Sequence, residues 1–193
     1  CADAREIPVE DNSVSLVVTS PPYVTSYEYA DLHQLSALWF DFTDNLPQFR
    51  KGFIGSSANG MTESIFKIGS KIGEEIVANL RNRKTGKADE VTKYFSEIRD
   101  SFLEMKRYLK KGGKACIVIG NTSFKGVSVT NAEVFVEQMQ NIRFKIYRVI
   151  KRIIPSKILP QTRDPKTGRF TSSSNSNKTL AYPFEYIIIM ERI

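Results

Sequence analysis

Apolar residues gather in four short segments of the chain. Ser13 to Thr19 (SVSLVVT), Lys114 to Gly120 and Phe184 to Glu191 are apolar runs, and Lys145 to Ile154 mixes apolar with basic residues. Short continuous apolar runs bounded by turn residues are typical of strands in the interior of a parallel sheet. We therefore predict four strands, the first of them buried and closed by Pro21-Pro22.

Between these segments the apolar residues recur every three or four positions, which predicts helices. The clearest helix covers residues 90–110 and is expected to stop at Gly112-Gly113, because glycine favours helix ends. Residues 131–141 and 31–42 are predicted as two further helices. The pattern weakens over residues 43–89, where we expect an insertion with one helix at about 62–80.

This order of elements indicates an α/β fold. The first three strands are joined through helices, so we expect them to run parallel. The last two strands are joined only by a long polar loop, residues 158–180, which predicts an antiparallel hairpin at the edge of a mostly parallel sheet. A chain of 193 residues is long enough for one domain with a proper core.

The positive charge of the chain is unevenly distributed. Residues 143–178 hold ten basic residues and one acid, Asp164, a local charge of +9 against a total of +7. A second basic cluster comprises Arg81, Arg83, Lys84 and Lys87. Clustered positive charge favours a polyanion such as nucleic acid, although a solvated basic loop is an equal alternative at this point.

Other composition limits the function classes. No stretch has the roughly 18 apolar residues of a membrane helix, and no signal peptide is recognisable. Two cysteines and one histidine make a metal site improbable, so we expect no metal and a cytoplasmic location. Because Cys1 is not preceded by an initiator methionine, we expect the chain to be a piece of a longer protein.

The segment Thr19-Ser20-Pro21-Pro22-Tyr23 follows the first predicted strand, and ligands of open α/β sheets bind beyond such strand ends. The Ser20 hydroxyl and a rigid proline carbonyl can accept hydrogen bonds from an exocyclic amine. Such acceptors favour a pyramidal nitrogen whose lone pair is free to attack a methyl donor. Tyr23 offers a flat face for an extruded base. The alternative is a plain Pro-Pro turn with a surface tyrosine.

Residues 2–23 (ADAREIPVEDNSVSLVVTSPPY) resemble two motifs of the amino-methyltransferases that modify exocyclic amines of DNA bases. The resemblance is specific there, moderate over residues 90–121 and architectural elsewhere. It implies a Rossmann-like methyltransferase sheet that uses S-adenosylmethionine. By position, it implies that Ser20, Pro21, Pro22 and Tyr23 hold the target amine and base, and that Asp3, Ala4 and Thr19 lie beside the cofactor.

The family binds S-adenosylmethionine with a glycine-rich loop after its first strand, and no segment of this sequence matches that loop. We therefore interpret residues 1–193 as the C-terminal portion of one catalytic domain, with a helical insertion at about 43–89 and a basic loop at about 155–182. Alone, the chain is expected to hold the cofactor poorly or not at all. A missing N-terminal segment or a homodimer is expected to complete the domain.

Several residues outside the motif are candidates for contact with nucleic acid. They are Tyr29, Arg152, Lys157, Arg163, Lys166 and Arg169. Asn121, after the second predicted strand, either faces the site or caps the next segment. For His33 a structural or surface role is expected, and Trp39, with Leu32, Leu35 and Leu38 on one face of its helix, is expected in the core.

The predicted function is site-specific DNA methylation at N4 of cytosine or N6 of adenine, in a chain that is inactive if truncated. The serine of the motif resembles the N4-cytosine enzymes. One alternative is an RNA methyltransferase acting on N2 of guanine. Another, of a different class, is a catalytically incomplete subunit that binds nucleic acid. Whether a restriction endonuclease accompanies the protein is left open.

Overall fold

The structure is a computed structural model of the whole chain. It describes residues 2–24, 29–56, 66–124, 126–154, 162–164, 171–172, 174–180 and 184–193.

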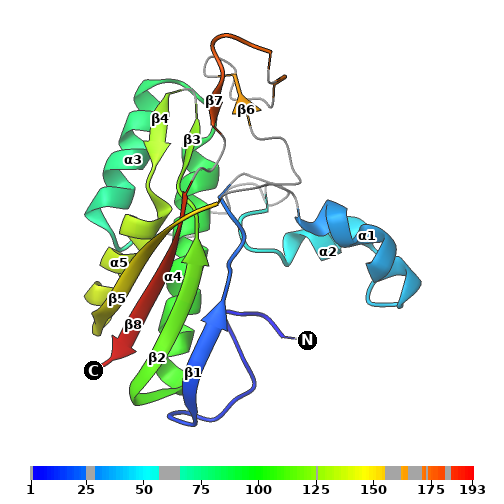
Figure 1. Cartoon of the computed structure of the whole chain (residues 1–193). Coiled ribbons are helices and arrows are strands. Elements are labelled where there is room, and N and C mark those ends of the chain that lie inside the picture. The colour runs from blue at the N-terminus through cyan, green and yellow to red at the C-terminus, as the bar shows by residue number, and fades with distance from the viewer. Residues whose placement is uncertain are drawn as a thin grey trace.

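A four-stranded sheet forms the centre of the fold (Figure 1). Its strands are β1 (Val14–Thr19), β2 (Leu109–Ile119), β8 (Phe184–Arg192) and β5 (Phe144–Ile153), in the order β1-β2-β8-β5. β1 pairs with β2 in parallel, and β8 is antiparallel to both β2 and β5. The prediction of an α/β fold with an antiparallel hairpin is confirmed.

The prediction of a mostly parallel sheet is wrong, because the last strand does not lie at the edge of the sheet. β1, β2 and β5 do run in one direction, but β8 lies between β2 and β5. Only one of the three pairings is therefore parallel. β8 brings the apolar residues Ile188 and Met190 to the centre of the sheet, where both side chains are fully buried. Its apolar sequence suits that interior position.

Three helices cover one face of the sheet and enclose the core. They are α3 (Lys71–Asn82), α4 (Ala88–Tyr108) and α5 (Asn131–Asn141). Phe102 of α4 meets Phe135 of α5 edge to face, at 5.2 Å between ring centroids. α5 matches its predicted bounds. α4 ends at Tyr108, before the glycines that were expected to stop it, because Leu109 already has the extended backbone of β2.

The glycine pair serves the sheet instead of the helix. The register between β1 and β2 shifts between Val14 and Leu16, and Gly112 has a φ of +78° within this irregular part of β2. A bulge with a left-handed backbone favours glycine. Gly113 also lies too close to Lys110 and Ser15 backbone oxygens for a side chain, since an added Cβ would be 2.8 Å from the first.

The other face of the sheet is open, and no helix among the described residues covers it. Leu16 and Val18 of β1 are 58% and 68% exposed on this face. The prediction that the first strand is buried is therefore wrong on one side. Of the apolar residues of β1, only Val14 and Val17 pack against the core.

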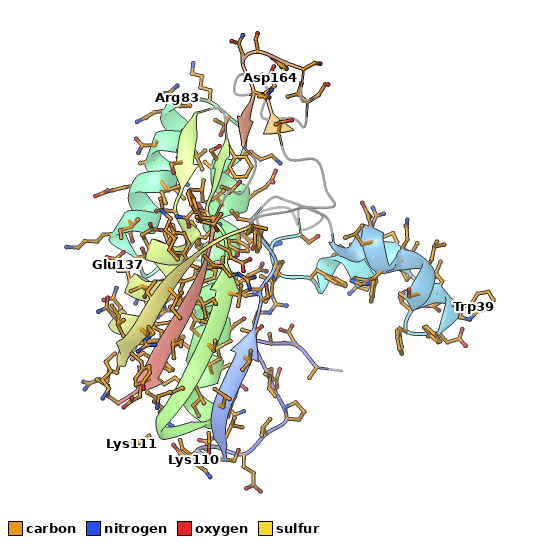
Figure 2. The ribbon with its side chains drawn as sticks, viewed as in Figure 1. Trp39, Arg83, Lys110, Lys111, Glu137 and Asp164 are labelled. Atoms are coloured by element: carbon orange, nitrogen blue, oxygen red, sulfur yellow. The ribbon has the colours of Figure 1, made fainter. Side chains whose placement is uncertain are left out.

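α1 (Tyr29–Trp39) and α2 (Leu46–Lys51) project from the domain beside β1 (Figure 1). The prediction of Trp39 in the core is wrong, because its side chain is 83% exposed at the far end of this projection (Figure 2). Leu32, Leu35 and Leu38 are exposed as well. The helical spacing was correct, but the described residues place nothing over that face.

Two small hairpins complete the described part of the chain. β3 (Thr122–Phe124) and β4 (Val127–Val129) form one, which the sequence analysis missed. β6 (Thr162–Arg163) and β7 (Thr179–Leu180) form the other, so the predicted polar loop contains paired backbone. In the predicted insertion, α3 begins at Lys71 behind Ser70, whose hydroxyl accepts the Gly73 N–H at 3.0 Å. Within the described ranges, none of the helices is long and apolar enough to cross a membrane.

Candidate active site

The Ser20–Tyr23 segment lies at the carboxyl ends of the two parallel strands. β1 ends at Thr19, which pairs with Ile117 of β2, and the chain then passes through the two prolines to Val24. Val24 is fully buried and anchors the far end of the segment in the core. Ser20 is exposed, and Pro21, Pro22 and Tyr23 are half-buried, so the segment is accessible from solvent.

The Ser20 hydroxyl has a defined direction. It donates a hydrogen bond to the Val118 carbonyl of β2 at 3.2 Å. A hydroxyl has one proton and two lone pairs, so a serine that donates to the protein can still accept hydrogen bonds on its solvent side. Ser20 therefore presents a hydrogen-bond acceptor at the end of the sheet.

The backbone of the two prolines is fixed from the core by Tyr94. This tyrosine of α4 is 1% exposed, and its hydroxyl donates to the Pro22 carbonyl at 2.7 Å. Prolines lack an N–H and a free φ, so one strong bond to their carbonyl restricts the segment considerably. Sequence reasoning identified Tyr94 only as part of the apolar face of a helix. Its spacing gave no signal of the bond to Pro22.

Tyr23 rests against the backbone at the end of β2. A Cβ atom added to Gly120 would be 2.9 Å from Cε2 of the Tyr23 ring, so only glycine allows this approach. The Gly120 carbonyl accepts a hydrogen bond from Nδ2 of Asn131, which is fully buried. The next residue, Asn121, caps α5, since its Oδ1 accepts the Ala132 N–H at 3.0 Å. Of the two roles considered for Asn121, the structure supports capping.

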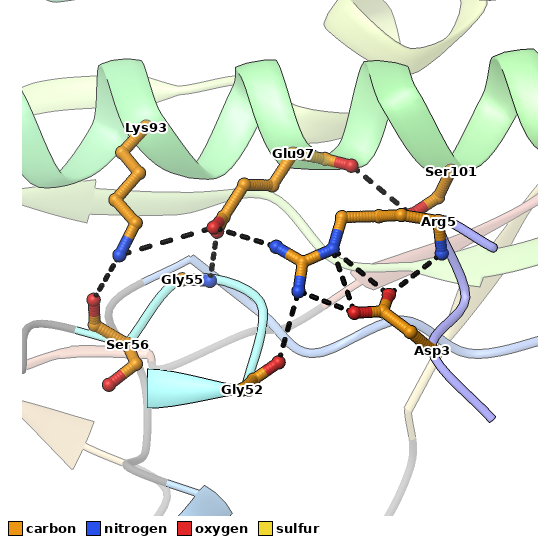
Figure 3. A network of polar contacts seen from close by, with 8 residues as sticks. All are labelled: Asp3, Arg5, Gly52, Gly55, Ser56, Lys93, Glu97 and Ser101. Atoms are coloured by element: carbon orange, nitrogen blue, oxygen red, sulfur yellow. Dashed lines mark hydrogen bonds and ion pairs between the residues drawn. The ribbon is translucent and has the colours of Figure 1, made fainter. Parts of the chain in front are cut away.

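Asp3 belongs to a polar network with residues of α4 and of the segment after α2, shown in Figure 3. Arg5 donates to the Asp3 carboxylate from its backbone N–H, Nε and Nη2, at 2.8, 2.9 and 2.6 Å. These contacts with Arg5 hold the pKa of Asp3 below its ordinary value. Arg5 also binds Glu97 of α4 at 2.9 Å, and Glu97 accepts the Gly55 N–H. The network ties the N-terminal turn to the segment after α2.

An open groove of roughly 620 Å³ lies beside Asp3. It is lined by Ala2, Asp3, Glu6, Ile7, Pro8, Glu104 and Arg107. The Asp3 carboxylate is already engaged by Arg5, Ala4 is exposed, and Thr19 is half-buried in β1. Of the three residues expected beside the cofactor, only Asp3 lines this groove.

The candidate contacts for nucleic acid are described only in part. Arg152 of β5 is 61% exposed at its side chain and pairs with Glu185, whose negative charge offsets that of the guanidinium. Neighbouring Lys151 lies over the Phe184 ring at 4.1 Å from the centroid. Lys151 pairs with Tyr186, which pairs with Ile119. This basic end of β5 therefore lies at the same end of the strands as Ser20. Arg163 lies in β6, and Tyr29 begins α1. Lys157, Lys166 and Arg169 lie outside the described residues.

This geometry defines an α/β protein with hydrogen-bond acceptors at the carboxyl edge of a mixed sheet. The family model described as DNA methylase, of the N6/N4 type, matches residues 14–192. The chain therefore belongs to the N6/N4 DNA methylase family. The match includes the whole sheet and the Ser20–Tyr23 segment, and it confirms the resemblance found in the sequence.

Solved structures are more distant. A Thermus thermophilus protein assigned as a DNA modification methylase is 15% identical over 99% of this chain and 52% of its own, with a TM-score of 0.47. A structure of it complexed with S-adenosyl-L-methionine gives 16% identity over 98% of this chain and 53% of its own, with a TM-score of 0.46. This chain thus spans about half the length of that protein. No curated protein matches it.

Proposed function

We propose that this chain forms the target-base half of an S-adenosylmethionine-dependent methyltransferase that modifies an exocyclic amine of DNA, most specifically N4 of cytosine. The observation that supports this most is the arrangement of Ser20. Its proton is directed to Val118, its oxygen faces solvent, and it stands beside a proline backbone held by Tyr94. N6 of adenine is the second substrate within the same proposal.

The residues of this chain act on the acceptor amine. An exocyclic amine is a weak nucleophile because its lone pair is delocalised into the ring. The Ser20 oxygen and the Pro21 carbonyl accept its two N–H groups, which favours a pyramidal nitrogen with a localised lone pair. Tyr23, steadied against Gly120, stacks on the extruded base. S-adenosylmethionine, when bound, supplies the electrophilic methyl group.

We further propose that residues outside this sequence provide the cofactor loop. The open face of the sheet and the exposed edge of β1 support this, because a doubly wound sheet has helices on both faces. Either an upstream segment or a second polypeptide would fill these positions. In such an assembly Asp3 lies where the resemblance places the adenosine.

A noncatalytic role is the second candidate, and one observation favours it. Asp3 is fully engaged by Arg5, so its carboxylate has to exchange partners before it can contact a cofactor. A chain that keeps this pair would bind nucleic acid without methylating it. Calorimetry with S-adenosylmethionine, on the chain and on the complete gene product, separates the two candidates.

The decisive test is methyl transfer from labelled S-adenosylmethionine by the complete gene product, with duplex DNA and transfer RNA as substrates. We expect incorporation into DNA, and Ser20→Ala or Tyr23→Ala is expected to abolish it. Ser15→Ala, an exposed serine on β1 before the motif, is the matched control and should retain the rate. Near-normal rates in both motif variants would refute the role of the motif. Incorporation into transfer RNA alone would identify the RNA enzyme instead.

A further inference from the structure

An open groove separates the C-terminal end of α3 from the turn of the β3–β4 hairpin. Its volume is roughly 430 Å³. The lining residues are Asn79, Asn82, Arg83, Gly126, Val127 and Ser128. Four of these offer hydrogen-bond donors on their side chains, and none is acidic. Val127 is 7% exposed, whereas all four residues with side-chain donors are exposed. This composition suits an anion better than an apolar ligand.

The groove lies at the same end of the sheet as the methyltransferase motif, where β1 and β2 have their carboxyl ends. β3 begins at Thr122, two residues after the glycine against which Tyr23 rests. At roughly 3.3 Å per extended residue, Gly126 in the hairpin turn is at most about 20 Å from Gly120. Figure 2 shows Arg83 beside this hairpin, at the opposite end of the molecule from Lys110 and Lys111. A DNA strand with its target base at Tyr23 therefore passes within reach of the groove.

The charge at the groove is available for binding. Of the basic cluster at the end of α3, Arg81 pairs with Asp89 at 3.5 Å and Lys87 pairs with Glu90 at 2.7 Å. Arg83 and Lys84 make no ion pair within the described ranges of the chain, and both are exposed. A helix C-terminus carries a partial negative charge of about half an elementary charge. The two positive charges of Arg83 and Lys84 are larger, so a net positive charge remains at this end of α3.

We propose that this groove binds a backbone phosphate of the DNA strand that holds the target base. The proposal rests on the proposed function and adds a second contact point to it. Arg83 presents a planar fork that can bind two phosphate oxygens, and the amides of Asn79 and Asn82 can donate to the same group. Such a contact positions the duplex without reading its sequence.

The test is the salt dependence of duplex affinity for the complete gene product. Each phosphate contact contributes about 0.9 to the slope of log affinity against log salt concentration. We expect Arg83→Gln to reduce the slope by about that amount and to weaken binding about tenfold at low salt. Arg83→Lys is expected to keep the slope but not the full affinity, because lysine retains the charge and lacks the fork. Lys111→Gln, an exposed lysine at the far end of the sheet, is the control and should change neither value.

The outcomes separate this proposal from the proposed function. An unchanged slope in Arg83→Gln, with wild-type binding intact, overturns the groove and leaves the methyltransferase in place. A reduced slope in a protein that binds DNA but methylates nothing supports the groove and removes the enzyme. A wild-type protein that binds no duplex overturns both. Thermal unfolding of each variant checks that the exposed substitutions leave the fold intact.

Discussion

At the scale of single residues, the motif depends on groups that its own sequence does not contain. Tyr94 comes from a helix more than 70 positions away, yet its hydroxyl fixes the Pro22 carbonyl. Gly120 and Asn131 set the position of Tyr23 in the same indirect way. The motif read from the sequence therefore contains only the groups proposed to meet the amine. It does not identify the atoms that hold them in place.

The bond from Tyr94 leads to a prediction about rate. Tyr94→Phe removes the hydroxyl while keeping the ring in the core, so the proline segment gains freedom. We expect kcat for methylation to fall about ten- to hundredfold, because small displacements of a reacting group are costly. The KM for DNA should change little, and the free energy of unfolding should fall by only about 1 kcal/mol.

Tyr108→Phe is the control for this measurement. Tyr108 is also buried on α4, at 5% exposure, and no hydrogen bond of its hydroxyl is found within the described residues. If both variants lose the same amount of activity, the effect belongs to the helix in general. An unchanged kcat in Tyr94→Phe would show that the Pro22 bond does not position the amine.

At the scale of elements, the sequence predicted the helices and strands whose positions depend on local patterns of apolar residues. The bounds of α5 agree with the prediction because Val134, Phe135 and Met139 face the core at helical spacing. The strands also lie close to their predicted positions. The errors arise from contacts between distant parts. Gly112 serves a strand irregularity, and β8 enters the middle of the sheet, where no local pattern records its neighbours.

One contact between elements allows a pH-dependent prediction. Glu137 of α5, labelled in Figure 2, accepts hydrogen bonds from the Ser70 hydroxyl and the Ile72 N–H at the start of α3. Burial alone would raise its pKa, but these bonds outweigh burial and lower it below the ordinary 4.5. A carboxylate whose pKa is lower in the folded than in the unfolded state stabilises the protein at pH values above its unfolded-state pKa. That stability is lost as pH falls through the folded value.

Glu137→Gln should therefore reduce the free energy of unfolding by about 1 kcal/mol at pH 7, the usual size of a helix N-terminal contact. The difference from wild type should narrow as pH falls below 4.5, because the wild-type carboxylate then becomes protonated. Urea unfolding at neutral and acid pH measures both values. Glu75→Gln, an exposed glutamate on α3, is the control. A difference that stays constant with pH would show that the charge of Glu137 is not involved.

At the scale of the whole molecule, helices cover one face of the sheet, and no helix of the described residues covers the other. The covered face contains the fully buried Ile117, Ile188 and Met190. On the open face, the register aligns Val18, Cys116 and Ile189 across three strands, and Leu16 lies beside the ion pairs of Glu191 with Lys114 and Lys145. An apolar row next to a strand edge that is unpaired in the described part of the chain is typical of an interface.

This open face leads to a prediction about self-association. The isolated chain should form dimers or larger species in a concentration-dependent way, because burial of Leu16 and Val18 removes apolar area from water. Val18→Lys places a charge in the centre of the apolar row and should shift the equilibrium toward monomer. Sedimentation at several concentrations measures the shift. Leu103→Lys, on α4 and 37% exposed, changes an apolar residue of the helical layer and should leave association unchanged. A wild-type chain that stays monomeric, or equal effects of the two lysines, would mean that the open face does not drive association.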